Sequence, residues 1–226
     1  PANKQGRIAA DNICGGNSRF HGSQGSSVLK LFGLTAASTG INEKAAQAAG
    51  ITYDKVVLFP ASHATYYPGA QSMAMKVLYE KESLRLLGAQ IVGGDGVDKR
   101  IDVLATAIRA KMTALELTEL DLSYAPPYSS AKDPVNMAGF MIEDLESEKV
   151  QQFHWNEVED LPCDGSATLL DVRTAREYQR GHLDGFRNIP LDDLREYLDE
   201  LDRGKPVYVN CQTGLRSYLA CRLLTQ

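Results

Sequence analysis

The sequence predicts an α/β protein with two domains, and three observations support this. Its 226 residues are enough for one large or two small domains. Short apolar runs of strand length, such as residues 74–79 and 84–92, alternate with helical patterns such as residues 97–112. A charged stretch at residues 143–149 then ends this alternation. We interpret it as the solvated end of a helix, followed by an exposed connector between the domains.

The first domain is predicted to mix strands and helices. Residues 5–13 predict a helix with no strand before it, and residues 28–32 predict a strand after a Gly-Ser turn. Asn42 is a candidate N-cap for the Ala-rich helix that follows it. The remaining predictions are strands at residues 55–59, 74–79 and 84–92 and a helix at residues 97–112 with an apolar face of Ile101, Leu104, Ala105 and Ile108.

The first domain is expected to be α+β, and the second is expected to be an α/β domain in which strands alternate with helical turns around a central parallel sheet. Residues 167–172 form an apolar run of strand length, and residues 174–179 predict a helical turn. Residues 181–190 are expected to form a loop that leads to a second short strand. These elements precede the strand and loop that contain Cys211.

Cys211 lies in a tight loop between a predicted strand and a predicted helix. The strand at residues 207–210 follows a Gly-Lys-Pro breaker, and apolar residues recur at helical spacing over residues 215–223. Gly214 would let the backbone curl. The amide N–H groups of such a loop and the helix N-terminus together favour an anion. A cysteine held there loses its proton easily, the thiolate is the nucleophilic form, and Arg216 adds a cation.

The alternative for Cys211 is a buried structural cysteine at the end of a core strand. Free thiols are often buried in this way, and Cys163 and Cys221 fit that description better. The glycine, the arginine and the strand–loop–helix context favour a reactive thiolate at Cys211. Cys14 is expected at a helix end without a catalytic role.

The composition limits the classes of partner. With 24 basic and 29 acidic residues and no basic tract, the chain does not predict a nucleic-acid surface. No apolar run approaches membrane-spanning length, and the start has no signal pattern. The 4 cysteines show no metal-ligand pairing and no disulfide framework. We therefore expect a thiolate enzyme without a metal in a reducing cytoplasm.

Two parts of the second domain resemble the rhodanese sulfurtransferases. Cys211-Gln212-Thr213-Gly214-Leu215-Arg216 resembles the six-residue active-site loop of that family, whereas related phosphatases carry one more residue between the cysteine and the arginine. The other matching stretches are Leu169-Leu170-Asp171-Val172-Arg173, Glu177-Tyr178, Gly181-His182-Leu183-Asp184-Gly185 and Asn188-Ile189-Pro190-Leu191.

This resemblance implies a role for each matching residue of the loop. Cys211 and Arg216 would be catalytic, and the residues that form the anion cradle would be Gln212, Thr213, Gly214 and Leu215. Asp171 and Arg173 lie at the carboxyl end of a strand, where open α/β sheets place their sites. We expect these two residues, and His182, to order the loop through hydrogen bonds rather than to react.

The first domain resembles the carboxyl-terminal dimerisation domain of the flavin-dependent pyridine-nucleotide disulfide oxidoreductases. Together with a rhodanese-like domain it resembles the coenzyme A-disulfide reductase branch, whose fused members are implicated in reducing coenzyme A disulfides, persulfides or polysulfides. The matching stretches are Gln5-Gly6-Arg7-Ile8-Ala9-Ala10-Asp11-Asn12-Ile13, Thr39-Gly40-Ile41-Asn42-Glu43, Gly96-Val97-Asp98-Lys99-Arg100-Ile101-Asp102 and Tyr124-Ala125-Pro126-Pro127-Tyr128-Ser129-Ser130-Ala131-Lys132-Asp133-Pro134-Val135-Asn136.

The resemblance implies FAD, NAD(P)H and coenzyme A for the intact protein. The sequence of this chain shows no glycine-rich phosphate loop for FAD or NAD. Gly93-Gly94-Asp95-Gly96 comes nearest, but its spacing is wrong, and a turn between strand and helix explains it. The redox half of the reaction would therefore depend on parts outside this chain.

Two tyrosine-containing loops have two interpretations. By composition, Tyr66-Tyr67-Pro68-Gly69 and Tyr124-Ala125-Pro126-Pro127-Tyr128 are proline-stiffened loops whose rings cover apolar surface. In the coenzyme A-disulfide reductase family, two tyrosines of this domain reach into the partner's active site and can protonate a leaving thiolate. Tyr66 and Tyr124 are the best matches, with Tyr67 as an alternative to Tyr66. That role implies a homodimer.

We expect four segments along the chain. Residues 1–22 would be a remnant of the flavin-binding domain and residues 23–142 the dimerisation domain. Residues 143–152 would form a linker and residues 153–226 the rhodanese-like domain. Because a domain seldom starts on an unpaired helix, and a rhodanese sheet normally continues further, we expect the chain to be cut at both ends.

Three functions are compatible with these patterns. The first is a fused enzyme in which Cys211 takes sulfane sulfur from a small donor and passes it to coenzyme A or another thiol, and a reductase half then cleaves the sulfur–sulfur bond. The second is a sulfur-carrier or binding module that serves another protein. The third is a dimerisation scaffold with a regulatory rhodanese-like part, which the presence of both Cys211 and Arg216 disfavours.

Overall fold

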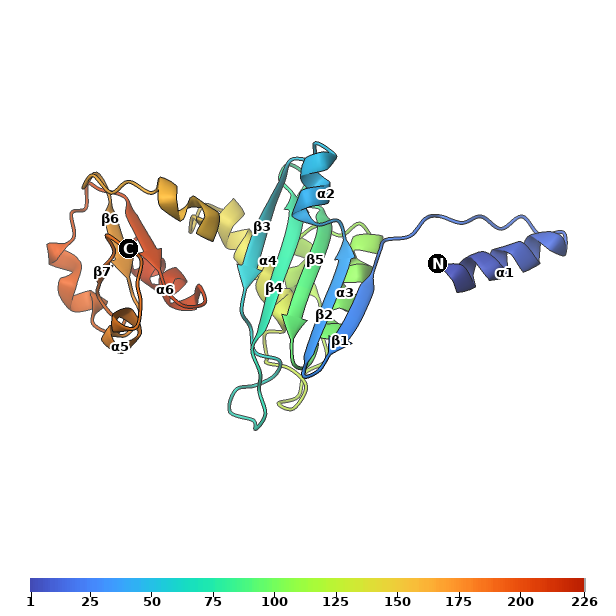
Figure 1. Ribbon diagram of the computed structural model, residues 1–226, viewed down its shortest axis with the longest axis horizontal. Helices are drawn as coiled ribbons and strands as arrows, with labels where there is room; N and C mark the ends of the chain where they lie inside the picture. Colours follow the sequence, from blue (N-terminus) through green and yellow to red (C-terminus); the bar gives the residue numbers. More distant parts are fainter. Residues whose placement is uncertain (226) are drawn as a thin grey trace. The chain divides into compact units, whose positions relative to one another are not determined.

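The computed structural model describes residues 1–225 and divides into two compact units. The division falls between Gly139 and Phe140, inside helix α4 (Pro134–Glu146). Each unit has its own sheet (Figure 1). The α/β fold class predicted from the sequence is therefore confirmed.

The first unit is built on a five-stranded antiparallel sheet in the order β1-β2-β5-β4-β3 (Figure 1). Four of its strands were predicted within a few residues, and β2 was missed. The run from Thr35 to Thr39 consists of small and hydroxylated residues, so it lacks the apolar alternation that marks a strand. The strands are β1 (Ser27–Leu31), β2 (Leu34–Gly40), β3 (Tyr53–Leu58), β4 (Met73–Glu80) and β5 (Leu86–Gly93).

Three helices and one short 3₁₀ segment accompany this sheet. Asn42 caps α2 as predicted, since its side chain accepts a hydrogen bond from the Ala45 N–H at 2.9 Å. Helix α3 packs against β2 and β5, and it ends at Arg109 rather than at Met112. The segments are α1 (Ala2–Ile13), α2 (Glu43–Ala48), α3 (Val97–Arg109) and η1 (Leu115–Glu119).

The buried face of α3 differs from the predicted one. Ile101 and Leu104 are buried as expected, but Ala105 and Ile108 are only partly buried. The buried face is instead completed by Val97, Arg100 and Ala107, of which Arg100 is charged. The buried residues of α3 are Val97, Arg100, Ile101, Leu104 and Ala107.

The strands β2 and β5 approach each other closely at two glycines. A Cβ on Gly88 would lie 1.9 Å from the carbonyl oxygen of Ile41, and a Cβ on Gly40 would lie 2.2 Å from that of Leu87. Gly40 also has a φ of +68°, which disfavours L side chains. The glycines therefore let β2 end against β5, just before Asn42 starts α2.

The second unit contains a three-stranded parallel sheet in the order β7-β6-β8. The central parallel sheet predicted for this half is therefore confirmed. The predicted second strand does not follow the 181–190 loop but lies within it, as β7, because Arg187 and Asn188 pair with β6 before Pro190. The segments are η2 (Trp155–Asp160), β6 (Thr168–Asp171), α5 (Ala175–Gln179), β7 (Arg187–Asn188), η3 (Leu194–Glu200), β8 (Val207–Asn210) and α6 (Leu215–Leu224).

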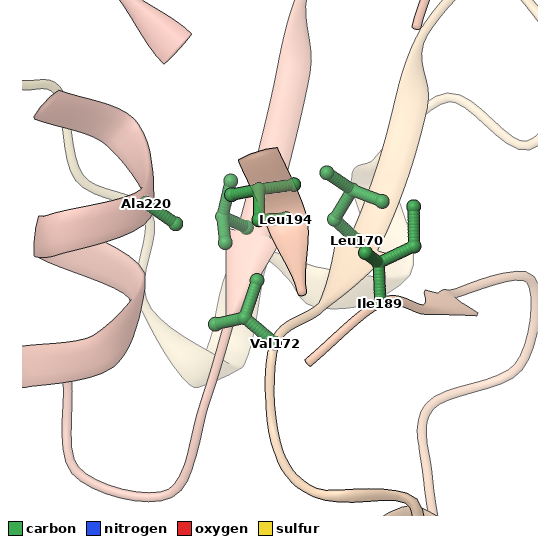
Figure 2. Close-up of a cluster of buried hydrophobic side chains, with 6 residues drawn as sticks. Leu170, Val172, Ile189, Leu194 and Ala220 are labelled. Atoms are coloured by element: carbon green, nitrogen blue, oxygen red, sulfur yellow. The ribbon is translucent and has the colours of Figure 1, made fainter. Parts of the chain in front are cut away.

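A small apolar core joins the sheet of this unit to α6. Figure 2 shows its side chains gathered toward one another from β6, the segments that follow β6 and β7, η3 and α6. Leu215 and Leu219, which helped to predict α6, are exposed, whereas Ala220 faces the core. The buried members labelled in Figure 2 are Leu170, Val172, Ile189, Leu194 and Ala220.

The end of α4 and the residues after it are fastened to α6. The hydroxyl of Tyr218 donates a hydrogen bond to the Asp144 carboxylate at 2.8 Å. The guanidinium of Arg222 donates to the carbonyl oxygen of Lys149 at 2.7 Å. The charged stretch that suggested a connector thus makes specific contacts inside the second unit.

Candidate functional site

The Cys211 loop connects β8 directly to α6. β8 ends at Asn210 and α6 begins at Leu215, so Cys211 is the first residue beyond the sheet. Gly214 is the N-cap of α6 and has a left-handed φ of 95°, a conformation that favours glycine. Asp171 pairs with Asn210 in the parallel sheet, which brings the carboxyl ends of β6 and β8 to the same edge. The chain therefore places Cys211 where α/β sheets hold their sites.

The sulfur of Cys211 is surrounded by hydrogen-bond donors. The backbone N–H groups of Gly214 and Ser217 point at Sγ with distances of 3.1 and 3.3 Å. The thiol itself donates to Ser217 Oγ at 3.4 Å, while the Ser217 hydroxyl donates to the carbonyl oxygen of Gly214 at 2.9 Å. Once the thiol loses its proton, the Ser217 hydroxyl can turn and donate to the sulfur instead.

These donors favour the thiolate of Cys211. Partial burial of the thiol raises its pKa, but hydrogen bonds from the Ser217 side chain and from the N–H groups of Ser217, Thr213 and Gly214 outweigh burial, so the pKa lies below its ordinary value. The other cradle residues, Gln212 and Leu215, are exposed, as is Thr213, so the loop faces solvent.

The other three cysteines differ from Cys211. All four thiols of the chain are free. Burial raises the pKa of Cys221, and the charge of Cys211 raises it further, so its thiol stays protonated. Cys14 is exposed at the end of α1, as predicted. Cys163 is also exposed, and the expectation that it would be buried is wrong, because it lies in a loop before β6 rather than at a strand end.

Arg216 is held by an acidic partner that the sequence analysis did not single out. Its Nη1 and Nη2 donate to the two carboxylate oxygens of Glu177 at 2.8 and 2.7 Å. Glu177 also accepts hydrogen bonds from the backbone N–H and the hydroxyl of Thr174, which accepts one in return. The signal for this was the capping-box spacing of Thr174 and Glu177 at the start of α5. These partners lower the pKa of Glu177, Arg216 first among them.

Asp171 and Arg173 form a second ion pair at the same edge of the sheet. The Asp171 side chain is fully buried, and Arg173 Nη2 donates to its Oδ2 at 2.6 Å. The same Nη2 donates to the carbonyl oxygen of Gly181 at 2.9 Å. Asn188 donates to the carbonyl oxygens of both Asp171 and Arg173. The pair thus joins β6, β7 and the loop after α5.

His182 lies in that loop and contacts Tyr178. Its ring is stacked on the Tyr178 ring with 3.8 Å between centroids, and its Nδ1 lies 3.1 Å from the carbonyl oxygen of Tyr178. Tyr178 in turn donates to the carbonyl oxygen of Phe186. These contacts fix the conformation of the loop.

In the first unit, Tyr66 and Tyr124 meet although they are 58 residues apart. Their hydroxyl oxygens lie 3.0 Å from each other, and both rings are exposed. The hydrogen bond to Tyr66 raises the pKa of Tyr124. Tyr67, the alternative to Tyr66, instead packs its ring edge-on against His63. The two loops that carry the pair extend beyond the same end of the sheet (Figure 1).

A buried arginine holds these two loops together. Arg100 of α3 is 1% exposed, and its Nη2 contacts Asp133 Oδ2 at 3.0 Å. The same atom donates to the carbonyl oxygen of Ser62, in the Tyr66 loop, at 2.9 Å. Sequence reasoning missed Arg100 because a charged residue is not expected on the buried face of an amphipathic helix. Its further acceptors are the carbonyl oxygens of Gly96 and Tyr128 and the hydroxyl of Ser129.

Two glycines of the turn between β5 and α3 lie against side chains of the same unit. A Cβ on Gly94 would lie 1.6 Å from the Gln71 side chain, and a Cβ on Gly96 would lie 2.2 Å from the Arg100 guanidinium. The side chains of Gln71 and Arg100 therefore occupy the positions next to these two glycines.

Residues 1–225 contain neither a cluster of metal-binding side chains nor a membrane-spanning helix. Within that range, no three His, Cys, Asp or Glu side chains are grouped so that they could hold a metal ion. None of the helices in the described part of the chain is long and apolar enough to cross a membrane.

Comparison with known proteins identifies both units. Residues 27–134 match the model of the pyridine nucleotide-disulphide oxidoreductase dimerisation domain, a domain through which proteins of this family dimerise. Residues 154–226 match the rhodanese-like domain. A coenzyme A disulfide reductase of Staphylococcus haemolyticus is 41% identical over 145 residues, which are 64% of this chain and 32% of that protein.

Two solved structures resemble the whole chain. Reduced CoADR-RHD of Bacillus anthracis is 47% identical with a TM-score of 0.93, covering 100% of this chain and 40% of that one. The NAD-dependent persulfide reductase of A. fulgidus is 42% identical with a TM-score of 0.88, covering 99% and 40%.

The chain thus spans between about a third and two fifths of the length of these relatives. Its first unit thus matches the dimerisation domain of the pyridine nucleotide-disulphide oxidoreductases, and its second unit matches the rhodanese-like domain.

Proposed function

We propose that this chain is part of a flavin-dependent reductase of coenzyme A disulfide, persulfide or polysulfide, in which Cys211 carries sulfane sulfur. The observation that carries the proposal is the set of donors around Cys211 Sγ, at 3.1 Å from the Gly214 N–H and 3.3 Å from the Ser217 N–H. Such donors stabilise a thiolate before the reaction and a terminal persulfide charge after it. The coenzyme A disulfide reductase and persulfide reductase names of the relatives support the same chemistry.

The transfer at Cys211 needs no external oxidant or reductant. The thiolate attacks the outer sulfur of a donor R–S–S⁻, and the sulfur–sulfur bond of the donor breaks as the new one forms. R–S⁻ leaves and takes a proton from water, and Cys211 becomes Cys–S–S⁻. A second thiolate, such as that of coenzyme A, then removes the outer sulfur by the same step and restores Cys211.

Tyr66 and Tyr124 are proposed to act in the reductase half. Each of two phenols that share a hydrogen bond can hold a proton near neutral pH, so the pair can donate to a thiolate that leaves a disulfide. Both hydroxyls lie on the surface of the dimerisation domain. We therefore propose a homodimer in which they serve the partner's site, with FAD, NAD(P)H and coenzyme A as groups of the whole protein.

We further propose the domain division predicted from the sequence. Residues 1–22 would belong to a flavin-binding domain, residues 23–142 to the dimerisation domain, and residues 153–226 to the rhodanese-like domain. The segment 143–152 would link them. Its contacts from Asp144 and Lys149 to α6 support a link that is held by the second domain.

The first experiment is intact mass spectrometry of the chain after exposure to inorganic polysulfide, with and without dithiothreitol. We expect a gain of one sulfur atom that dithiothreitol removes, that Cys211→Ser abolishes and that Cys221→Ser retains. A gain that persists in Cys211→Ser would refute Cys211 as the carrier. No gain in the wild-type chain would favour the scaffold function instead.

A further inference from the structure

Arg216 of the Cys211 loop and Arg173 at the same edge of the sheet are both paired with carboxylates. Arg216 forms two hydrogen bonds with Glu177, and Arg173 forms three with Asp171. The bidentate geometry is the strongest that arginine makes with a carboxylate. These four side chains contribute two positive and two negative charges, so they cancel.

The groups that contact the sulfur are uncharged. The donors to Sγ are the N–H groups of Gly214 and Ser217 and, for the thiolate, the Ser217 hydroxyl. The exposed residues of the loop are Gln212, Thr213, Gly214 and Leu215, which carry no charge either. Neutral dipoles of this kind can stabilise one negative charge at the sulfur. A second negative charge on the donor molecule finds no unpaired cation in the loop.

We propose that Glu177 selects the sulfur donor of Cys211: by occupying Arg216, it directs the site toward monoanionic persulfides and away from dianionic thiosulfate. This inference rests on the proposed function of Cys211 as a sulfur carrier. Glu177 acts as a positioning residue, since it contacts Arg216 and Thr174 but not the sulfur.

The charge balance of the two reactions explains the selectivity. A thiolate and R–S–S⁻ together carry two negative charges, and the products Cys–S–S⁻ and R–S⁻ carry two. With thiosulfate the same attack on the outer sulfur releases sulfite, and three negative charges are present throughout. A free cation beside the loop would favour the second reaction more than the first, because Coulomb attraction grows with the charge of the donor.

Glu177→Gln tests this with little disturbance of the fold. Glutamine at this position still accepts the hydrogen bonds from Thr174 that begin α5, because Gln serves in a capping box as Glu does. The change removes one negative charge and leaves Arg216 in place. The matched control is Glu200→Gln, which removes the same charge from another ion pair of the same unit, that with Arg187.

The experiment measures the rate of Cys211 persulfide formation by rapid-quench mass spectrometry, with glutathione persulfide and with thiosulfate at equal concentrations. For Glu177→Gln we expect the thiosulfate rate to rise about tenfold relative to the persulfide rate. Glu200→Gln should leave this ratio unchanged. An unchanged ratio in Glu177→Gln, or an equal shift in Glu200→Gln, would overturn the proposal.

A measurement on the wild-type chain covers the case in which the variant folds poorly. If Arg216 is neutralised, thiosulfate loading should not fall as the ionic strength rises from about 0.05 to 0.5 M. A decrease of severalfold would show that a free cation steers the dianion, and would overturn the proposal. Failure of the proposed function is distinct, since Cys211 would then gain sulfur from neither donor.

Discussion

The Cys211 loop and the tyrosine pair are assembled in opposite ways. The groups that form hydrogen bonds with Cys211 Sγ come from the next six residues of the chain. The hydroxyls of Tyr66 and Tyr124 meet across 58 residues. The first arrangement follows from one strand, one turn and one helix, and the second exists only because distant loops are brought together. A local site tolerates changes elsewhere in the fold, whereas an assembled site depends on the residues that join its parts.

The interactions that hold the two sites in place also differ between local and distant residues. The sulfur is held by backbone N–H groups and one hydroxyl at the start of α6. The tyrosine loops are joined at a buried ion pair, Arg100 with Asp133, and by hydrogen bonds from Ala64 to the loop around Ser129. Breaking a buried ion pair leaves an uncompensated charge and is costly.

Arg100→Met should destabilise the first unit by about 3–5 kcal/mol, because buried Asp133 loses its nearer cation and keeps the more exposed Lys99 at 3.7 Å. Hydrogen exchange resolved by peptides would show faster exchange in residues 27–134 and no change in the second unit. Arg109→Met, at the exposed end of α3, is the control and should alter stability by less than about 0.5 kcal/mol. Equal effects of the two substitutions would mean that Arg100 does not join the loops.

Gly214→Ala should cost the second unit about 1–2 kcal/mol through backbone strain. A Cβ there meets nothing within 4 Å, so the left-handed φ of 95° is the only cause. Urea denaturation of the chain gives the loss of stability, and the persulfide assay gives the accompanying loss of rate. Gly204→Ala, whose φ is not in the left-handed region, should have neither effect. An unchanged free energy of unfolding in Gly214→Ala would contradict the left-handed conformation of Gly214.

Ser217→Ala should shift the pH dependence of Cys211 loading to higher pH. The Ser217 side chain lowers the pKa of Cys211, so its removal raises that pKa, and less thiolate is present at neutral pH. Loading should therefore slow at neutral pH, by about fivefold for a hydrogen bond of about 1 kcal/mol, and recover at alkaline pH. Stopped-flow alkylation of the thiol across the pH range measures the midpoint. A midpoint that moves down or stays fixed would exclude the Ser217 contribution.

Tyr66→Phe should have the smallest effect on stability, about 0.5 kcal/mol, because the hydroxyl pair is exposed. It should lower the pKa of Tyr124 toward its ordinary value, since the hydrogen bond that Tyr124 shares with Tyr66 is the largest cause that raises it. Ultraviolet titration of tyrosinate would detect this change. Tyr67→Phe is the control, because Tyr67 contacts His63 and not Tyr124.

The features that depend on residues close together in the chain could be predicted from the sequence. The order of strand, loop and helix around Cys211, the Asn42 cap and the four strands with apolar alternation all follow from contacts within a few positions. The loop residues could be recognised for the same reason, since the groups that surround the sulfur are contiguous with it.

Interactions between residues that lie far apart in the chain could be identified only from the tertiary structure. β2 is a strand because β1 and β5 pair with it on either side, although its own residues carry no strand pattern. Glu177 reaches Arg216 across 39 residues, and Arg100 gathers acceptors from two loops. A charged side chain shows its charge in the sequence but not its partner, because the partner depends on which segments the fold brings into contact. The local geometry of the loop therefore stabilises the Cys211 thiolate, whereas the tertiary fold pairs Arg216 with Glu177 and so sets the charge beside the loop.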